Sequence, residues 1–284
     1  MRTIEVQGHR GARGVAVENT LASFEAALDA CVGSIETDVH LACDGVPVLL
    51  HDSRIEFPGP LTGRLVRSLT LAELRTLTLP GPRERPAISA TRFAEAHGFG
   101  PFDVPTLADL LAFVKAYAGD ESKTPEQRMH ARHVIVDVEL KRTPFHAEYV
   151  GDGFTGAEPT TLERSVIAEI AQAEMFERAR IRSFDHRSVQ AARKLAPAIG
   201  VAFLVHNTVP ANLEAWLGDA DADCYCPDFA FVDGDVVYQA HCAGVRVIPY
   251  TVNNPADWSR LIEMGVDGIT TDYPETLVAW LRNR

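Results

Sequence analysis

The chain has 284 residues, of which 46% are hydrophobic and 23% charged, and its formal net charge is −12. This length fits one large domain or two small ones, and the composition is that of an ordinary globular protein whose core needs no disulfides. The acidic charge, without a run of basic residues, disfavours binding to nucleic acids or anionic membrane surfaces, and no stretch approaches the ~18 apolar residues of a membrane span.

Short β-rich segments alternate with segments of helical periodicity along most of the chain. Strands are expected at 3–7, 34–39, 46–50, 134–139, 180–184, 199–204, 222–226, 245–250 and 267–271. Helices are expected at 19–30, 106–118, 161–176, 186–195, 211–217, 234–243 and 255–263. This alternation is typical of a parallel sheet covered by helices.

The strand at 46–50 breaks the alternation because only a few residues around Asp44 and Gly45 separate it from the strand at 34–39. Parallel neighbours need a crossover of about a dozen residues, so this connection must be an antiparallel hairpin. The eight strands that remain predict a (β/α)8 TIM-type barrel, with residues 1–284 forming a single domain.

Residues 52–105 are rich in proline and glycine and interrupt the barrel pattern after the hairpin. A firm helix is expected only at 70–77, where Thr70 and Glu73 form a capping box. We interpret 52–105 as a small inserted subdomain or lid over the barrel mouth. A second polar stretch, 119–133, is expected to be a loop or a frayed helix.

The five cysteines lack the spacing of a redox or zinc pair, since Cys224 and Cys226 form only C-x-C. We expect reduced cysteines packed in strands. The N-terminal residues MRTIEVQGHR contain no apolar segment of a signal peptide, so we expect a cytoplasmic protein unless an export signal has been removed.

Two carboxylates, Glu36 and Asp38, lie two positions apart on one strand and therefore project from the same face. They repel each other unless a cation joins them, and a hard divalent ion such as Mg²⁺ or Ca²⁺ suits oxygen ligands. Glu139 at the end of the 134–139 strand would supply a third carboxylate, and Lys141 on the same face would add positive charge. An all-oxygen set makes zinc an unsuitable metal.

Histidines stand beside these carboxylates. His9 and Arg10 end the first strand, where barrels carry their active sites. A hairpin turn at Asp44 pairs residues whose numbers sum to about 88, which sets Glu36 opposite His51 or the residue after it. Each signal alone has an ordinary explanation as a solvated or packing side chain, but their joint position favours one site.

The chain also resembles a known family. The segments HRGARGVAVENTLASFEAAL, IETDVHLACDGVPVLLHD and VDVELK, with SFD, YTVN and DGITTDYP further on, are similar to the glycerophosphodiester phosphodiesterase family. The resemblance spans nearly the whole chain, and 52–105 occupies the place of the family's insertion. Tyr250 stands where the family often has tryptophan, which leaves the alcohol side of the substrate open.

The resemblance implies a role for each residue of the expected site. His9 and His51 would be the acid and base, Glu36, Asp38 and Glu139 would bind one divalent cation, Mg²⁺ or Ca²⁺, and Arg10 and Lys141 would contact the phosphate. The implied reaction is the metal-dependent hydrolysis of small-molecule glycerophosphodiesters to glycerol 3-phosphate and an alcohol.

Two alternatives remain open. One is a related barrel phosphodiesterase that acts on lysophospholipids and stops at a cyclic phosphate, which a longer apolar groove around 52–105 would favour. The other is a non-catalytic module that binds phosphodiesters, although all seven positions of the expected site are filled. A barrel sugar-phosphate isomerase would not require three clustered carboxylates and two histidines.

Overall fold

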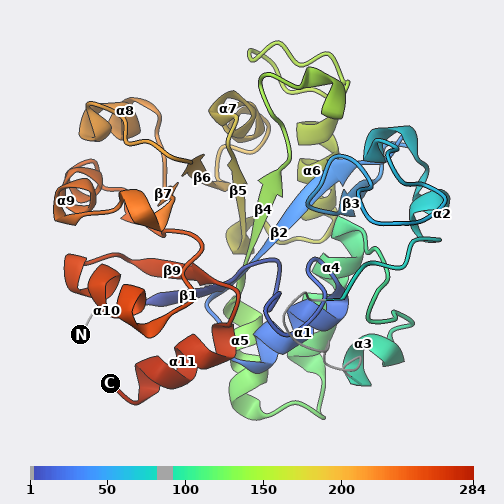
Figure 1. The fold of residues 1–284 in the computed structure, drawn as a ribbon, viewed down its shortest axis with the longest axis horizontal. Coiled ribbons are helices and arrows are strands. Elements are labelled where there is room, and N and C mark those ends of the chain that lie inside the picture. Colours follow the sequence, from blue (N-terminus) through green and yellow to red (C-terminus); the bar gives the residue numbers. More distant parts are fainter. Residues whose placement is uncertain (1–2, 82–91) are drawn as a thin grey trace.

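Within residues 3–81 and 92–284, which the computed structural model describes, eight parallel strands form a nearly closed barrel with helices around it (Figure 1). The strands are β1 (Glu5–Gly8), β2 (Ser34–Leu41), β4 (Ile135–Leu140), β5 (Ala179–Ser183), β6 (Gly200–Val205), β7 (Cys224–Pro227), β8 (Arg246–Val247) and β9 (Gly268–Thr271). They are hydrogen-bonded in the order β8-β7-β6-β5-β4-β2-β1-β9. Backbone bonds from Asp267 N to Val247 O (2.9 Å) and from Thr270 N to Pro249 O (3.0 Å) link the two ends of this order. The predicted TIM-type barrel is therefore confirmed.

The predicted hairpin is also present. The short strand β3 (Pro47–Leu49) pairs antiparallel with β2, and Val39 faces Leu49 while His40 faces Val48. These pairs have the register that a turn at Asp44 predicts. A backbone bond from Leu50 N to Asp38 O (3.2 Å) extends the pairing toward His51.

The long helices lie on the outside of the barrel (Figure 1). They are α1 (Leu21–Asp29), α4 (Leu107–Gly119), α5 (Pro125–His133), α6 (Thr161–Gln172), α7 (His186–Leu195), α8 (Leu213–Asp219), α9 (Gly234–Cys242), α10 (Pro255–Met264) and α11 (Pro274–Arg282). Single 3₁₀ turns are η2 (Ala147–Tyr149), η3 (Phe176–Arg178) and η4 (Phe229–Phe231). The apolar faces of the long helices and the outward faces of the strands form one continuous core. Leu21 and Phe24 of α1 and Ile35 of β2 are fully buried in it.

The segment 52–105 carries η1 (Val66–Ser68), α2 (Leu71–Leu74) and α3 (Arg92–Ala96), and its residues 82–91 lie outside the described part of the chain. Thr70 and Glu73 form the predicted capping box, although α2 is shorter than expected. A separate apolar cluster joins this segment to the hairpin, with Leu69 and Leu74 packed near Val48.

Two helices outside the segment 52–105 also differ from the prediction. The stretch 119–133, expected as a loop or frayed helix, contains the regular helix α5, so that prediction was wrong. Thr124 and Gln127 form a capping box and Pro125 occupies the first turn, which together stabilise a helix of low hydrophobicity. The helix α11 was not predicted, and it also begins with a proline, Pro274.

All five cysteines are free. Cys224 and Cys226 are buried in β7, whereas Cys43 and Cys242 are exposed and lie outside strands, so the expectation that all of them pack in strands was wrong. None of the helices within residues 3–81 and 92–284 is long and apolar enough to cross a membrane.

Candidate active site

The seven residues of the expected site come from four neighbouring strands: Glu36 and Asp38 lie within β2, and the other five lie at or just beyond the carboxyl ends of β1, β3 and β4. This end of a barrel is where active sites are found. The oxygens of Glu36, Asp38 and Glu139 come within 4.8 Å of one another, and all three side chains are buried. The register explains the cluster, because Asp38 on β2 pairs directly with Glu139 on β4.

Two positively charged side chains lie beside the carboxylates. The Nε atom of Arg10 lies 3.0 Å from an oxygen of Asp38, and the backbone N–H of Arg10 donates to Glu36 at 2.8 Å. The Nζ atom of Lys141 lies 2.8 Å from Glu139 and 3.2 Å from Asp38. The two residues expected to contact phosphate therefore flank the expected metal ligands.

Burial and the nearby carboxylates Asp38 and Glu139 raise the pKa of Glu36 well above its ordinary value. Burial would also raise the pKa of Asp38, but Lys141 and Arg10 hold it below its ordinary value. The Oε1 atom of Glu36 has no hydrogen-bond partner among the described residues. A buried carboxylate oxygen without a donor is costly unless a cation binds it.

His9 is held by a carboxylate that the sequence reading did not single out. Its Nδ1 lies 2.6 Å from Oδ1 of Asp272, in the loop after β9. Asn253 donates from Nδ2 to the other oxygen of Asp272 at 2.8 Å and accepts its backbone N–H at 2.9 Å. Burial lowers the pKa of His9, and the hydrogen bond to Asp272 opposes this effect.

His51 has a similar but more exposed partner. Its Nδ1 lies 2.7 Å from Oδ1 of Asp52, and its backbone carbonyl is 3.1 Å from Nε2 of buried His40. Asp52 is 58% exposed, against 18% for Asp272, so the two histidine–carboxylate pairs differ in their exposure to water. In both pairs Nδ1 is occupied, which leaves Nε2 for a substrate.

The turn after β1 explains the local motif His-Arg-Gly. Gly11 has φ +84°, and a Cβ at this position would lie 2.5 Å from the backbone carbon of Ser23 at the start of α1. Asn19, also missed as a site residue, donates to Asp38 at 2.9 Å and accepts from Thr37 at 2.9 Å. Asn19 and Asp272 lie in the segments Glu-Asn-Thr and Thr-Asp-Tyr-Pro, which are part of the family resemblance. The sequence therefore pointed to both residues but did not indicate what they do.

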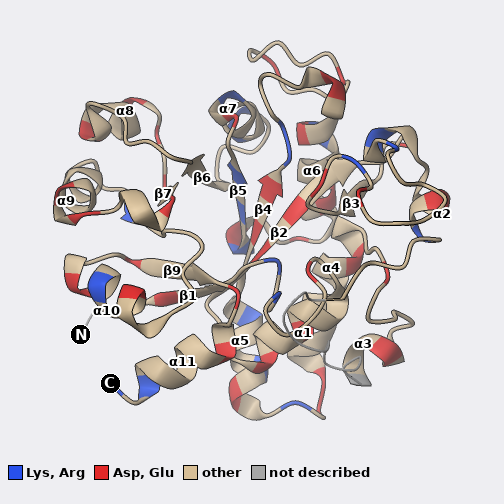
Figure 2. Cartoon of the chain, viewed as in Figure 1, with Lys and Arg blue, Asp and Glu red and all other residues tan. Residues whose placement is uncertain are grey.

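Beneath the site, the barrel interior is charged on the side of β2, β4 and β5, whereas β6 and β7 contribute to a small buried apolar cluster. Figure 2 shows acidic residues on β2 and β4 next to basic residues on β5. Arg180 and Arg182 both donate to one oxygen of buried Asp137, at 2.7 and 3.1 Å. Gln7 donates to the same oxygen at 2.7 Å.

A cavity of about 570 Å³ opens beside His51. Arg10, His51 and Asp272 line one side, and Ile55 and Phe57 of the segment 52–105 line another. The cavity therefore connects this segment with the candidate site.

The residues present fit a hard divalent cation. Three carboxylates supply only oxygen donors, and one buried oxygen of Glu36 lacks a partner. Oxygens bound to one Ca²⁺ can lie up to about 5 Å apart, which matches the spacing of this cluster. A second group of possible ligands, Cys31, Glu126 and His130, lies at the opposite end of the barrel, and Arg282 already pairs with Glu126 there at 2.6 Å.

Comparisons with known proteins identify the family. A sequence model of the "Glycerophosphoryl diester phosphodiesterase family" matches residues 9–276. A glycerophosphodiester phosphodiesterase from Caldanaerobacter subterraneus is 28% identical over 284 residues, which cover 99% of both chains.

Solved structures agree on the fold. A phosphodiesterase from Oleispira antarctica, in complex with the product sn-glycerol-3-phosphate, superposes with a TM-score of 0.75 at 22% identity, over 98% of this chain and 96% of that one. A glycerophosphodiester phosphodiesterase from Parabacteroides distasonis has a TM-score of 0.72 at 23% identity, over 100% of this chain and 98% of that one. Because the family match spans nearly the whole chain, the protein belongs to the glycerophosphoryl diester phosphodiesterase family and is a phosphodiesterase.

Proposed function

We propose that the protein hydrolyses glycerophosphodiesters to glycerol 3-phosphate and an alcohol in a reaction that depends on one divalent cation. The observation that carries the proposal is the cluster of three buried carboxylates at the barrel end that also bears His9 and His51. Membership of the family supports the reaction, and the related enzyme from Oleispira antarctica holds sn-glycerol-3-phosphate as its product.

Glu36, Asp38 and Glu139 would hold the cation, Mg²⁺ or Ca²⁺. When bound, such an ion draws negative charge from a phosphate oxygen and so stabilises the transition state of phosphoryl transfer. Arg10 and Lys141 contribute positive charge from the protein itself. The planar guanidinium of Arg10 suits two parallel hydrogen bonds to the phosphate, and Lys141 acts as a point charge.

The two histidines move the protons. The oxygen of water, or of the neighbouring glycerol hydroxyl, attacks phosphorus and gives its proton to one histidine; attack by the hydroxyl forms a cyclic phosphate, which a water molecule must open in a second step to give glycerol 3-phosphate. The bond between phosphorus and the alcohol oxygen breaks, and the other histidine protonates that oxygen. Asp272 and Asp52 hold Nδ1 of His9 and His51, which directs both Nε2 atoms to these transfers.

We also propose that residues 1–284 form one barrel domain in which 52–105 is an inserted subdomain that covers the mouth. The apolar cluster that joins this segment to the hairpin supports this assignment. The cavity wall formed by Ile55 and Phe57 also supports it, because the segment would then lie beside the path of the substrate.

The test is an assay of glycerol 3-phosphate release from a panel of glycerophosphodiesters, beginning with glycerophosphocholine. We expect activity to disappear with EDTA and to return when Mg²⁺ or Ca²⁺ is added in excess. Full activity after exhaustive chelation would exclude metal dependence, and no release from any diester of the panel would refute the proposed reaction.

Each histidine is tested separately. His9→Ala and His51→Ala should each lower kcat at least ~10²-fold, because each removes one proton transfer. His133→Ala is a control that should keep wild-type turnover, because His133 is exposed at the end of α5, next to the amino end of β4 and not its carboxyl end. Near-normal turnover in either site variant would remove that histidine from the scheme.

A second candidate substrate is a lysophospholipid, which the apolar cavity residues Ile55, Phe57 and Leu79 favour. Phosphorus NMR of the products distinguishes the two. A cyclic phosphate as the end product would support the second candidate.

A further inference from the structure

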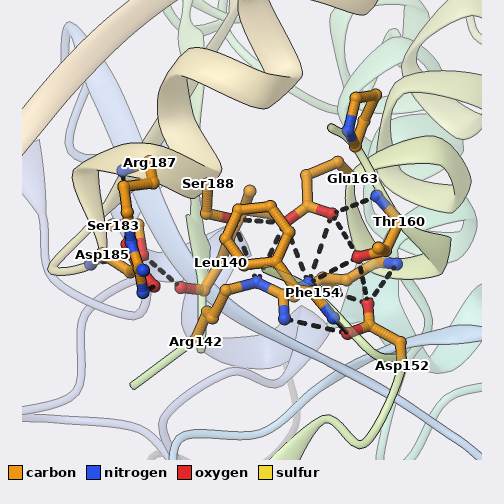
Figure 3. Close-up of polar contacts among 12 residues, drawn as sticks. Leu140, Arg142, Asp152, Phe154, Thr160, Glu163, Ser183, Asp185, Arg187 and Ser188 are labelled. Atoms are coloured by element: carbon orange, nitrogen blue, oxygen red, sulfur yellow. Dashed lines mark hydrogen bonds and ion pairs between the residues drawn. The ribbon is translucent and has the colours of Figure 1, made fainter. Parts of the chain in front are cut away.

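The side chains of Lys141 and Arg142, the two residues that follow β4, point in opposite directions. The ammonium of Lys141 lies at the mouth beside Glu139 and Asp38. The side chain of Arg142 lies on the other side of the strand, next to α6 and α7, and the residue is only 5% exposed (Figure 3). Adjacent side chains of an extended segment point to opposite faces, so one residue reaches the proposed phosphate site while the next is buried in the packing behind it.

All three nitrogens of the Arg142 guanidinium donate to carboxylates. Nη1 and Nη2 donate to the two oxygens of Asp152 at 2.9 and 2.8 Å, and Nε donates to Glu163 at 3.0 Å. The ring of Phe154 stacks 4.1 Å from the guanidinium carbon. A bidentate pair with a carboxylate fixes both the distance and the plane of the guanidinium.

These contacts join separate parts of the chain (Figure 3). Asp152 belongs to the loop between β4 and α6, Glu163 lies on α6, and Ser188 of α7 donates to Glu163. Burial would raise the pKa of Asp152, but hydrogen bonds from Arg142 and Thr160 lower it to about 2. The pair is therefore charged at neutral pH.

The backbone leaves the barrel ladder at this point. Lys141 N still bonds to Val39 O of β2 at 3.1 Å, whereas Arg142 N bonds back to Leu140 O of its own strand at 2.7 Å. Ser183 of β5 also donates to Leu140 O at 2.8 Å. The chain therefore turns out of the ladder directly after Lys141, at the residue whose side chain is bound by Asp152 and Glu163.

We propose that Arg142 is a positioning residue for Lys141. By fixing the backbone directly after Lys141, it keeps the flexible lysine side chain at the mouth in place to contact phosphate. This inference depends on the proposed function in one respect, namely that Lys141 contacts the phosphate. A lysine has four rotatable carbons and no planar fork, so its position depends strongly on its backbone.

The experiment measures the dissociation constant of glycerol 3-phosphate by calorimetry in Mg²⁺ buffer. Four proteins are compared: wild type, Lys141→Met, Arg142→Met and the double variant. We expect each single variant to bind ~10-fold more weakly, and the double variant to bind no more weakly than Lys141→Met alone. Such non-additivity is expected only if Arg142 acts through Lys141.

Arg142→Met leaves buried Asp152 without its cation and could prevent folding, so Asp152→Asn serves as a milder variant that keeps the pair with Glu163. It should weaken binding ~3-fold, again only when Lys141 is present. Arg187→Met is the matched control, because it removes a half-exposed cation from the same region and should not change the dissociation constant.

A lower melting temperature with wild-type affinity in these variants would overturn the inference, as would equal weakening with and without Lys141. Unchanged affinity in Lys141→Met would overturn both the inference and the phosphate role of Lys141. If the wild type binds glycerol 3-phosphate but hydrolyses no diester, the proposed function fails while the dissociation constants still decide the role of Arg142.

Discussion

Replacement of Asp272 by asparagine tests the proton-transfer scheme most directly. Asp272 accepts the Nδ1 proton of His9 over 2.6 Å, and Asn253 holds its other oxygen. An asparagine is nearly the same size, so the loop should keep its shape. The variant removes the negative charge and can turn an amide N–H toward Nδ1, which would favour the tautomer that carries its proton on Nε2.

The size of the effect follows from the burial of this pair. The side chains of His9 and Asp272 are 12% and 18% exposed, so solvent screens their interaction only in part. A hydrogen bond to a charged group contributes about 1.5–3 kcal/mol, and each 1.36 kcal/mol is tenfold in rate, which predicts a fall in kcat of ~10- to 150-fold. The pH–rate profile should also shift, because the variant removes the contact that raises the pKa of His9.

The assay compares kcat and its pH dependence for glycerophosphocholine in the wild type, Asp272→Asn and Asp52→Asn. Asp52 is the matched control because it contacts His51 in the same way but is 58% exposed. Its loss should lower kcat less than ~3-fold, as expected for a solvent-screened pair. Wild-type kcat with an unchanged profile in Asp272→Asn would refute this scheme for His9.

Three further predictions follow from other contacts. Glu36→Gln should weaken Mg²⁺ or Ca²⁺ binding at least ~10-fold in calorimetry, unlike Glu121→Gln on the surface, and equal affinities would contradict the metal assignment. Burial would raise the pKa of Glu5, but Arg180 and other cations lower it from 4.5 to about 2. Because the pKa is lowered, ionised Glu5 stabilises the fold by about 3 kcal/mol above pH 4.5, and this stability is lost as the pH falls toward 2. In Glu5→Gln, the free energy of unfolding in urea should therefore decline less steeply between pH 5 and 3. The same decline as in the wild type would contradict this prediction. Gly11→Ala should lower the free energy of unfolding in urea by at least ~2 kcal/mol, because the new Cβ adds a clash with α1 to the backbone strain. Gly45→Ala should lower it by only ~1 kcal/mol, because Gly45 has φ +81° but open space around it, and equal losses would show that the contact with α1 does not matter.

Much of the site could be predicted because a few local rules fix long-range geometry. A short connection at Asp44 requires an antiparallel pair, and a pair has one register, which brings His51 next to β2. Parallel strands then align Asp38 with Glu139 across a hundred residues of sequence. Alternation along a strand and the carboxyl-end rule for barrels supplied the rest.

The parts that the sequence did not reveal depend on side chains that meet through loops. Nothing in the spacing of His9 and Asp272 indicates that they touch, because the first and last strands become neighbours only when the barrel closes. The network of Arg142 with Asp152 depends on the path of an irregular loop. The helix α5 was missed for a different reason, since its stability comes from a capping box instead of an apolar stripe.

The charge at the mouth explains why an acidic protein with an anionic substrate would need a metal. Glu36, Asp38 and Glu139 carry three negative charges when ionised, and Arg10 and Lys141 supply two positive ones. With all three carboxylates ionised, one negative charge remains in excess among these five groups, which repels a phosphodiester. A divalent cation reverses the balance to one positive charge at the same place, and the surrounding burial strengthens its attraction for phosphate. The carboxylates that make the site unfavourable for substrate by themselves are thus the groups that would make it favourable once a cation is bound.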